Sequence, residues 1–121
     1  MSDVSIGFVK IPVSDLTRAA AFFREAVGLT EDFVVPAYGW GQFWTATVPL
    51  CLYVPGAGGG TAGTGVDTGI QFRTADARAL HARIAAAEGA TAGDLMEGDD
   101  GTLTFEFTDP DGNRFQMAQV A

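Results

Sequence analysis

Residues on which many functions depend are scarce in this sequence: one histidine, one cysteine, and seven lysines and arginines among 121 residues. The single cysteine, Cys51, excludes a disulfide within the chain, and its apolar neighbours predict a small buried side chain. Fifteen acidic residues outnumber the basic ones, which gives a net charge of −8. Because binding to nucleic acid needs clustered basic side chains that neutralise phosphates, this balance argues against a nucleic-acid partner.

Long apolar runs are also missing. No stretch approaches the roughly 18 apolar residues that a membrane-spanning helix needs, and the first residues lack the charged-then-apolar pattern of a secretion leader. We therefore expect no membrane partner and a cytoplasmic location. What the sequence does contain is 47% hydrophobic residues, in a length that fits one domain and can bury a core.

The most informative stretch is Asp-Pro-Asp-Gly-Asn at 109–113, which has an apolar strand pattern on either side. Pro110 presets φ for a turn, and Gly112 and Asn113 tolerate positive φ. Strands at 102–108 and 114–120 are therefore predicted to form a hairpin over this turn.

The rest of the chain reads as two helices among further strands. The helices are predicted to begin at the N-caps Asp15 and Asp76 and to end at Gly28 and Gly89. Further strands are predicted at residues 4–13, 33–35, 40–48, 50–54 and 68–74, with a short extended piece at 90–96. The Gly-rich segment 56–65 has little that could pack, and a flexible linker is predicted there.

The two halves of the chain match each other at a constant shift of 61 residues. Three pairs of turn and cap residues share this shift: Asp15 with Asp76, Gly28 with Gly89, and Pro49 with Pro110. Each half then reads strand, helix, strand, strand, strand. The prediction is an α+β fold, a single domain of two βαβββ modules at about 1–55 and 66–121, whose curved mixed sheets surround a cavity.

Alternation along each strand assigns side chains to the helix side or to the concave side of its sheet. Polar and aromatic residues assigned to the concave side are Phe8, Lys10, Gln71, Arg73, Glu106, Arg114 and Gln116. The repeat also pairs Phe43 with Thr104, which makes Phe43 concave and Trp44 a core residue, and Trp40 is expected at the rim. These side chains either pair with one another at strand ends or bind a polar, flat organic molecule.

On these features the chain resembles the vicinal oxygen chelate superfamily, the group of glyoxalases, bleomycin-resistance proteins and extradiol dioxygenases. The resemblance rests on residues 8–16, on 21–29, on 69–72 with Asp76, and on 109–113 with Gln116. It covers nearly the whole chain and implies the glyoxalase/bleomycin-resistance-like fold.

Metal-dependent members, such as the fosfomycin resistance proteins, carry two histidines and a glutamate where the resemblance places Phe8, Gly69 and Gln116 of this chain. Phe8 and Gly69 have no side-chain ligand, and Gln116 offers one neutral carbonyl oxygen. The only histidine, His81, falls on the second predicted helix, where a surface or packing role is expected. We therefore expect neither a metal nor another cofactor.

The favoured interpretation is a metal-free protein that binds a small organic ligand, as the bleomycin-resistance proteins sequester a drug. The resemblance also implies a homodimer. The alternative is an enzyme: a lyase, isomerase or dioxygenase with non-standard metal ligands, or a metal-free one with Glu106 or Lys10 as acid or base. A protein-partner role without any ligand is a third class, and the sequence identifies no catalytic residue.

Overall fold

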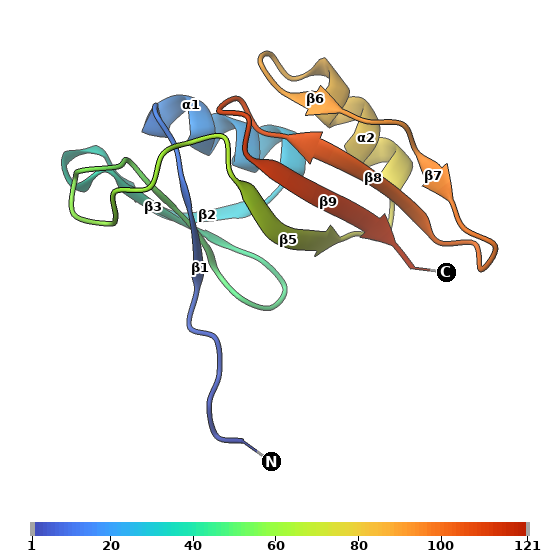
Figure 1. Ribbon diagram of the computed structural model, residues 1–121, viewed down its shortest axis with the longest axis horizontal. Coiled ribbons are helices and arrows are strands. Elements are labelled where there is room, and N and C mark those ends of the chain that lie inside the picture. The colour runs from blue at the N-terminus through green and yellow to red at the C-terminus, as the bar shows by residue number, and fades with distance from the viewer. Residues whose placement is uncertain (1, 121) are drawn as a thin grey trace. The chain divides into compact units, whose positions relative to one another are not determined.

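The computed structural model describes residues 2–120, and Figure 1 labels their elements. The chain divides into two compact units between Gly63 and Thr64. Within the described residues, no helix is long and apolar enough to cross a membrane. The α+β class predicted from the sequence is confirmed, because each unit combines one mixed sheet with one helical segment.

The first unit contains a sheet with strand order β1-β4-β3-β2, in which β1 and β4 are parallel and the other pairs antiparallel. Its elements are β1 (Val9–Pro12), α1 (Leu16–Ala21), η1 (Phe22–Val27), β2 (Thr30–Val35), η2 (Pro36–Tyr38), β3 (Trp40–Trp44) and β4 (Leu50–Tyr53).

The helical segment of the first unit begins and ends at the predicted residues. The Asp15 carboxylate accepts a hydrogen bond from the backbone N–H of Arg18 at 3.0 Å, and Gly28 ends the helix with a φ of 85°. Phe23, near the centre of this segment, is fully buried and lies 6.4 Å from the ring of Phe43 on β3. The helix therefore covers the face of the sheet to which Phe43 points.

The second unit contains a sheet with strand order β5-β9-β8-β6, in which β5 and β9 are parallel and β7 also pairs with β8. Its elements are β5 (Asp67–Arg73), α2 (Ala77–Ala86), β6 (Thr91–Ala92), β7 (Met96–Glu97), β8 (Leu103–Thr108) and β9 (Arg114–Gln119). Asp76 caps α2 by accepting a hydrogen bond from the backbone N–H of Ala79 at 3.1 Å, as predicted. Four aromatic rings pack beside one another in this unit: Phe72, Phe105, Phe107 and Phe115.

Two predicted strands are shorter than expected. Only Val9–Pro12 of the predicted strand 4–13 pairs with a neighbour, and the exposed residues before it extend away from the sheet of their own unit (Figure 1). The strand predicted at 40–48 ends at Trp44. The hydroxyl of Thr45 accepts from the backbone N–H of Thr47 and donates to the carbonyl of Val48, and these local bonds form a turn in place of the strand.

The constant shift of 61 residues holds at the N-caps, Asp15 and Asp76. It fails at the C-caps, because α2 ends with Ala87 as its C-cap and not at Gly89 as predicted, and it fails again in the later strands. The parallel pairs align Lys10 with Cys51 in one unit and Gln71 with Gln116 in the other. Cys51 and Gln116, 65 residues apart, are therefore the equivalent positions. Pro49 and Pro110 are not equivalent, since the second half contains additional residues before its last strands.

Candidate functional site

The open face of the second sheet, on the side away from α2, carries a cavity of about 220 Å³. Phe105 of β8 contacts His81 of α2, so its neighbour Glu106 points to the other side of the sheet. The cavity lies among β5, β8 and β9, and its polar lining residues are Asp67, Gln71, Glu106, Arg114 and Gln116. We call this the polar cavity.

A chain of hydrogen bonds runs along the polar cavity. The Nε of Arg73 donates to Oε1 of Gln71 at 3.2 Å, and Nε2 of Gln71 donates to Oε1 of Gln116 at 2.6 Å. Gln71 and Gln116 are neighbours in the parallel pair, and Glu106 lies directly opposite Gln116 in the antiparallel pair. The structure thus brings Gln71, Glu106 and Gln116 together in one cavity and places Arg73 beside it.

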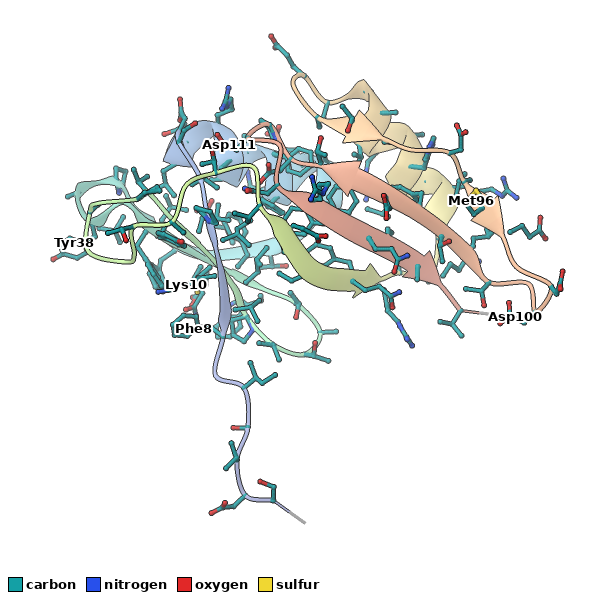
Figure 2. All side chains as sticks on the ribbon, viewed as in Figure 1. Phe8, Lys10, Tyr38, Met96, Asp100 and Asp111 are labelled. Carbon is teal, nitrogen blue, oxygen red and sulfur yellow. The ribbon has the colours of Figure 1, made fainter. Side chains whose placement is uncertain are left out.

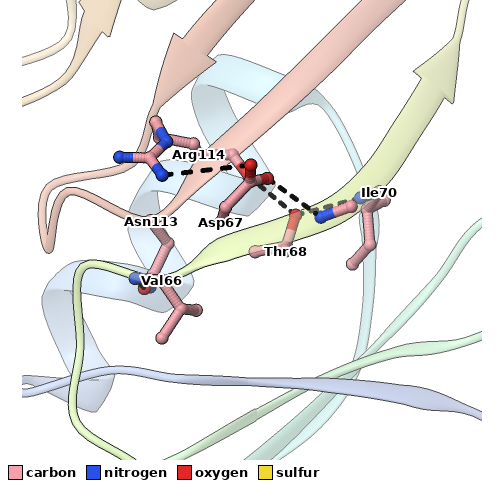
Figure 3. A network of polar contacts seen from close by, with 7 residues as sticks. Val66, Asp67, Thr68, Ile70, Asn113 and Arg114 are labelled. Atoms are coloured by element: carbon pink, nitrogen blue, oxygen red, sulfur yellow. Dashed lines mark hydrogen bonds and ion pairs between the residues drawn. The ribbon is translucent and has the colours of Figure 1, made fainter.

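The strand β5 bulges where it enters the cavity. Asp67 pairs with Arg114 and Gln71 with Gln116, so β5 has two more residues between these pairs than β9 has. The side chains of Asp67 and Thr68 accept hydrogen bonds from the backbone N–H groups of residues 69 and 70 at 3.2 and 3.1 Å (Figure 3). Gly69, within the bulge, has a φ of 67°, which favours glycine over residues with a Cβ.

The turn at 109–113 holds the start of β5 against β9. The Oδ1 atom of Asn113 accepts the backbone N–H groups of Gly65 and Val66 at 2.9 and 3.1 Å, and its Nδ2 donates to Oδ2 of Asp109 at 2.9 Å. Asn113 and Asp109 have no exposed surface, and burial raises the pKa of the Asp109 carboxyl. The sequence pattern gave these residues a turn role only; their burial links the turn to the register of the cavity strands.

The open face of the first sheet is aromatic. Trp40 and Trp44 alternate along β3 with the buried Gly41 and Phe43, so both tryptophans point away from the helix. Phe8 packs edge-to-face on Trp40 with ring centroids 5.6 Å apart, and Phe33 lies opposite the middle of β3. Phe8 and Trp44 are each 47% exposed and Phe33 is 40% exposed. We call Phe8, Phe33, Trp40 and Trp44 the aromatic face.

The sequence-based placements of Phe43 and Trp44 are wrong. Phe43 has no exposed surface and packs on Phe23, whereas Trp44, expected in the core, is exposed. The reason is the changed shift between the halves: strand pairing makes Phe43 equivalent to the buried Phe107, not to Thr104. Phe43 is therefore a core residue of the first unit.

Lys10 points to the open face of the first sheet, where it already has partners. Its Nζ donates to the carbonyl of Gly59 and lies 5.2 Å from the centre of the Tyr53 ring; Figure 2 shows Lys10 and Phe8 along this part of the chain. A Cβ at Gly59 would come within 2.8 Å of the Tyr53 Cβ and 3.0 Å of the Trp40 ring. Part of the segment predicted as a flexible linker thus packs against the first sheet, and glycine permits the close approach.

Of the two roles expected for His81, surface or packing, the structure shows packing. Its Nε2 lies 2.7 Å from the carbonyl oxygen of Gly93, which makes the nitrogen the donor, and its ring is edge-on to Phe105 at 4.9 Å. Within residues 2–120, no group of three or more His, Cys, Asp or Glu side chains could hold a metal ion.

Three residues of this chain stand where metal-dependent members of the resembled superfamily carry metal ligands, and they do not fit a metal ion. Gly69 contributes no side chain, and Phe8 has no ligand atom. The one candidate oxygen, Oε1 of Gln116, already accepts the hydrogen bond from Gln71. A neutral amide oxygen so engaged is a weak ligand for a transition metal.

Comparisons with known proteins agree with this fold. TnmS3, an antibiotic binding protein from Streptomyces sp. CB03234, is 25% identical, with a TM-score of 0.77 over 100% of this chain and 99% of that chain. A glyoxalase/bleomycin resistance protein from the same strain is 26% identical, with a TM-score of 0.75 over 95% of this chain and 100% of that chain. A lactoylglutathione lyase from Agrobacterium tumefaciens is 20% identical, with a TM-score of 0.73 over 98% and 96%, and shares the fold.

No curated protein matches the chain by sequence. The model of the Glyoxalase/Bleomycin resistance protein/Dioxygenase superfamily matches residues 5–117, nearly the whole chain. With its paired βαβββ topology and its Asp-Pro-Asp-Gly-Asn turn, the chain belongs to this superfamily.

Proposed function

We propose that this protein binds a small organic molecule without a metal ion and performs no chemistry on it. The observation that carries the proposal is the hydrogen bond between Gln71 and Gln116. Oε1 of Gln116, the one candidate ligand oxygen at the superfamily's metal position, accepts this bond, and both glutamines line the polar cavity. Such a cavity, with a few convergent polar groups, orients a ligand through hydrogen bonds.

The contacts of Lys10 favour binding over metal-free catalysis. Its ammonium is engaged by the Gly59 carbonyl and the Tyr53 ring, so a proton transfer from it would first break both contacts. Burial raises the pKa values of Cys51 and Asp109, and a hydrogen bond from the backbone of Thr102 lowers the pKa of Asp100; none of the three residues lines the polar cavity. The perturbed groups are thus away from the site, the reverse of what acid–base catalysis favours.

The aromatic face supports a flat, apolar portion in the ligand. Stacking of aromatic rings contributes about 0.5–1.5 kcal/mol per pair beyond the burial of area. Exposed phenylalanine and tryptophan side chains gathered on one sheet face also suit binding, because a contiguous apolar patch on a monomer is often functional.

The similar proteins point the same way. TnmS3 is described as an antibiotic binding protein, and it is similar to this chain over its full length. An antibiotic-like organic molecule is therefore the class of ligand that we propose.

Tryptophan fluorescence tests the proposal, because the chain has two tryptophans and both lie on the aromatic face. Protein treated with a chelator should bind planar organic compounds with a change in fluorescence and a raised Tm, since a ligand that binds only the folded state stabilises it. Adding zinc, manganese, nickel or iron should leave Kd unchanged. A bound metal in the purified protein, at about one per chain, or turnover that requires metal, would contradict the proposal.

We also propose a homodimer and a cytoplasmic location. In support of the dimer, Val4 and Ile6 before β1 are 81% and 66% exposed, and apolar side chains of this kind are suited to burial between subunits. Light scattering after gel filtration, over a hundredfold range of concentration, distinguishes a dimer from a monomer. Fractionation of the producing cells tests the location.

A further inference from the structure

The hydrogen-bond chain at the polar cavity has a fixed direction. We infer that Arg73, acting through Gln71, turns the –NH2 group of Gln116 toward the cavity, so that the cavity selects ligands with a carbonyl oxygen at that point. The part of the inference that concerns the ligand rests on the proposed binding function.

The direction is set by the chemistry of arginine. The guanidinium group of Arg73 carries only donors, so the atom of Gln71 that lies 3.2 Å from its Nε must be the amide oxygen. The –NH2 group of Gln71 then points to Gln116, and the atom that it meets at 2.6 Å must be an acceptor, Oε1. The orientation of the Gln116 amide, which could otherwise be either way round, is thus fixed by Arg73 through the amide of Gln71.

The result is an open donor in the cavity. Among residues 2–120, the hydrogen bond from Gln71 is the one hydrogen bond made by the Gln116 side chain, and Nε2 of Gln116 has no acceptor. Gln116 lines the cavity and is only half-buried, so its –NH2 group can reach a bound molecule. A ligand atom that satisfies it has to be an acceptor, which a carbonyl oxygen is.

An acceptor lies beside this donor. Glu106 is directly opposite Gln116 across the antiparallel pair, where Cβ atoms are about 5 Å apart, and it also lines the cavity. Its carboxylate makes no hydrogen bond or ion pair with the described residues. The cavity thus offers a donor and an acceptor side by side, which complements a carbonyl next to an N–H or O–H group, as in a carboxamide, a lactam or a hydroxyketone.

The size of the cavity indicates how much of the ligand enters it. Drug-sized molecules occupy pockets of about 300–1,000 Å³, and this cavity measures about 220 Å³. It therefore holds the polar edge of a ligand, and the remainder stays outside.

The direction of the relay can be tested without a ligand by NMR of the glutamine side-chain amides. One –NH2 proton of Gln71 should exchange with water more slowly than either –NH2 proton of Gln116, since only the Gln71 proton is held in a hydrogen bond. Arg73→Met should remove this difference, and Arg73→Lys, which keeps a donor, should retain it. Slow exchange at Gln116 in place of Gln71 would overturn the inference.

The consequence for selectivity can be tested with a matched pair of neutral probes. In 2-acetonaphthone and 2-isopropenylnaphthalene, a carbonyl oxygen is exchanged for a CH2 group of similar shape. The ketone should bind about three- to tenfold more tightly, because its oxygen accepts a hydrogen bond from the half-buried Gln116 that the alkene cannot accept. Arg73→Met and Gln116→Met should each bring the affinity ratio close to one, and Arg73→Lys should keep it within about twofold of the original.

Glu106 is tested with a second pair. Naphthalene-2-carboxamide should bind more tightly than 2-acetonaphthone, and Glu106→Leu should abolish that advantage while the ratio of ketone to alkene is unchanged. Equal affinities of ketone and alkene in the original protein would overturn the ligand class while leaving the binding function intact. Failure of all three probes would also overturn the ligand class, and the binding function is judged separately by the compound screen with tryptophan fluorescence.

Discussion

The two units have the same strand–helix topology and opposite surfaces. On the helix sides both bury apolar residues, such as Phe43 and its equivalent Phe107. On the open sides, strand pairing makes Trp40 the equivalent of Thr104, so the first sheet carries an aromatic side chain where the second carries a polar one, while Gln42 and its equivalent Glu106 are both polar. The residues on the helix sides thus maintain the repeated fold, and the residues on the open sides can differ between the units and support different binding chemistry.

The amides on the two faces show the same divergence. Gln42 is satisfied within its own sheet: its Nε2 donates to Asp32 at 3.0 Å, and its Oε1 lies 3.5 Å from Sγ of Cys51. Gln116, at the position equivalent to Cys51, keeps its –NH2 group open to the cavity. A satisfied amide stabilises the sheet, whereas an open one is available to a ligand.

The largest expected effect is a loss of stability from a substitution on the helix side of the first sheet. Phe43→Ala should lower the free energy of unfolding by about 3–5 kcal/mol, because it leaves a cavity against Phe23. Trp44→Ala, its neighbour on the opposite face, should change stability by less than about 1 kcal/mol and weaken the binding of planar compounds. Urea unfolding of both variants measures the contrast, and equal losses would mean that the two faces are not distinguished by burial.

The next largest effect disturbs the register of the second sheet. Asn113→Ala should lower the free energy of unfolding by about 2–4 kcal/mol, because it leaves the backbone N–H groups of Gly65 and Val66 and the carboxylate of Asp109 without their partner. Probe binding should weaken as well, since Gln116 follows three residues later. Thr47→Ala, in an exposed turn of the first unit, is the matched control and should stay within about 0.5 kcal/mol of the original. An Asn113→Ala variant as stable as the control would contradict the anchoring role.

The second unit contains a buried carboxyl group, Asp109, so we expect its stability to depend on pH. Burial raises the pKa of Asp109 above its ordinary value of 3.8, so the folded state holds the proton more tightly than the unfolded state. Its contribution to stability is greatest below that value and declines as the pH rises through the folded pKa. Asp109→Asn removes this decline while losing one hydrogen bond to Asn113.

The destabilisation by Asp109→Asn should therefore shrink as the pH rises from about 4 to about 7. Urea unfolding of the original protein and the variant at a series of pH values gives the difference directly. A difference that grows with pH would show that the folded state prefers the ionised carboxylate.

The smallest expected effect concerns the bulge in β5. Gly69→Ala should lower the free energy of unfolding by about 1 kcal/mol, because the φ of 67° is unfavourable for a residue with a Cβ although no atom lies within 4 Å of the position. Gly69→Asn should cost less, since asparagine tolerates this conformation. Equal effects of alanine and asparagine would show that the strain lies elsewhere.

Local chemistry explains what could be predicted from the sequence. The caps Asp15 and Asp76 and the turn at 109–113 depend on residues within a few positions of one another, and all three are where the patterns placed them. Gln71, Glu106 and Gln116 could be assigned to one face because alternation needs only the direction of a neighbouring core residue.

Long-range pairing explains what could not be predicted. The exposure of Phe43 and Trp44 depends on how β3 aligns with β4, and a shift inferred from the helix caps does not carry over to those strands. The bulge in β5 depends on side-chain bonds from Asp67 and Thr68 to the backbone, for which the sequence has no specific signal. The direction of the Gln116 amide depends on Gln71 of the neighbouring strand, and through it on Arg73, which does not contact Gln116 by a hydrogen bond.

The bonds from Asn113 to Gly65 and Val66 also bear on the order in which the second unit assembles. They join segments 48 and 47 residues apart in the chain, whereas the β8–β9 hairpin closes over a turn of a few residues. Short loops close at a lower entropic cost than long ones, so we expect the hairpin to form early and to act as the template on which β5 later docks. Pulse-labelled amide exchange during refolding should then show protection in β8 and β9 before β5.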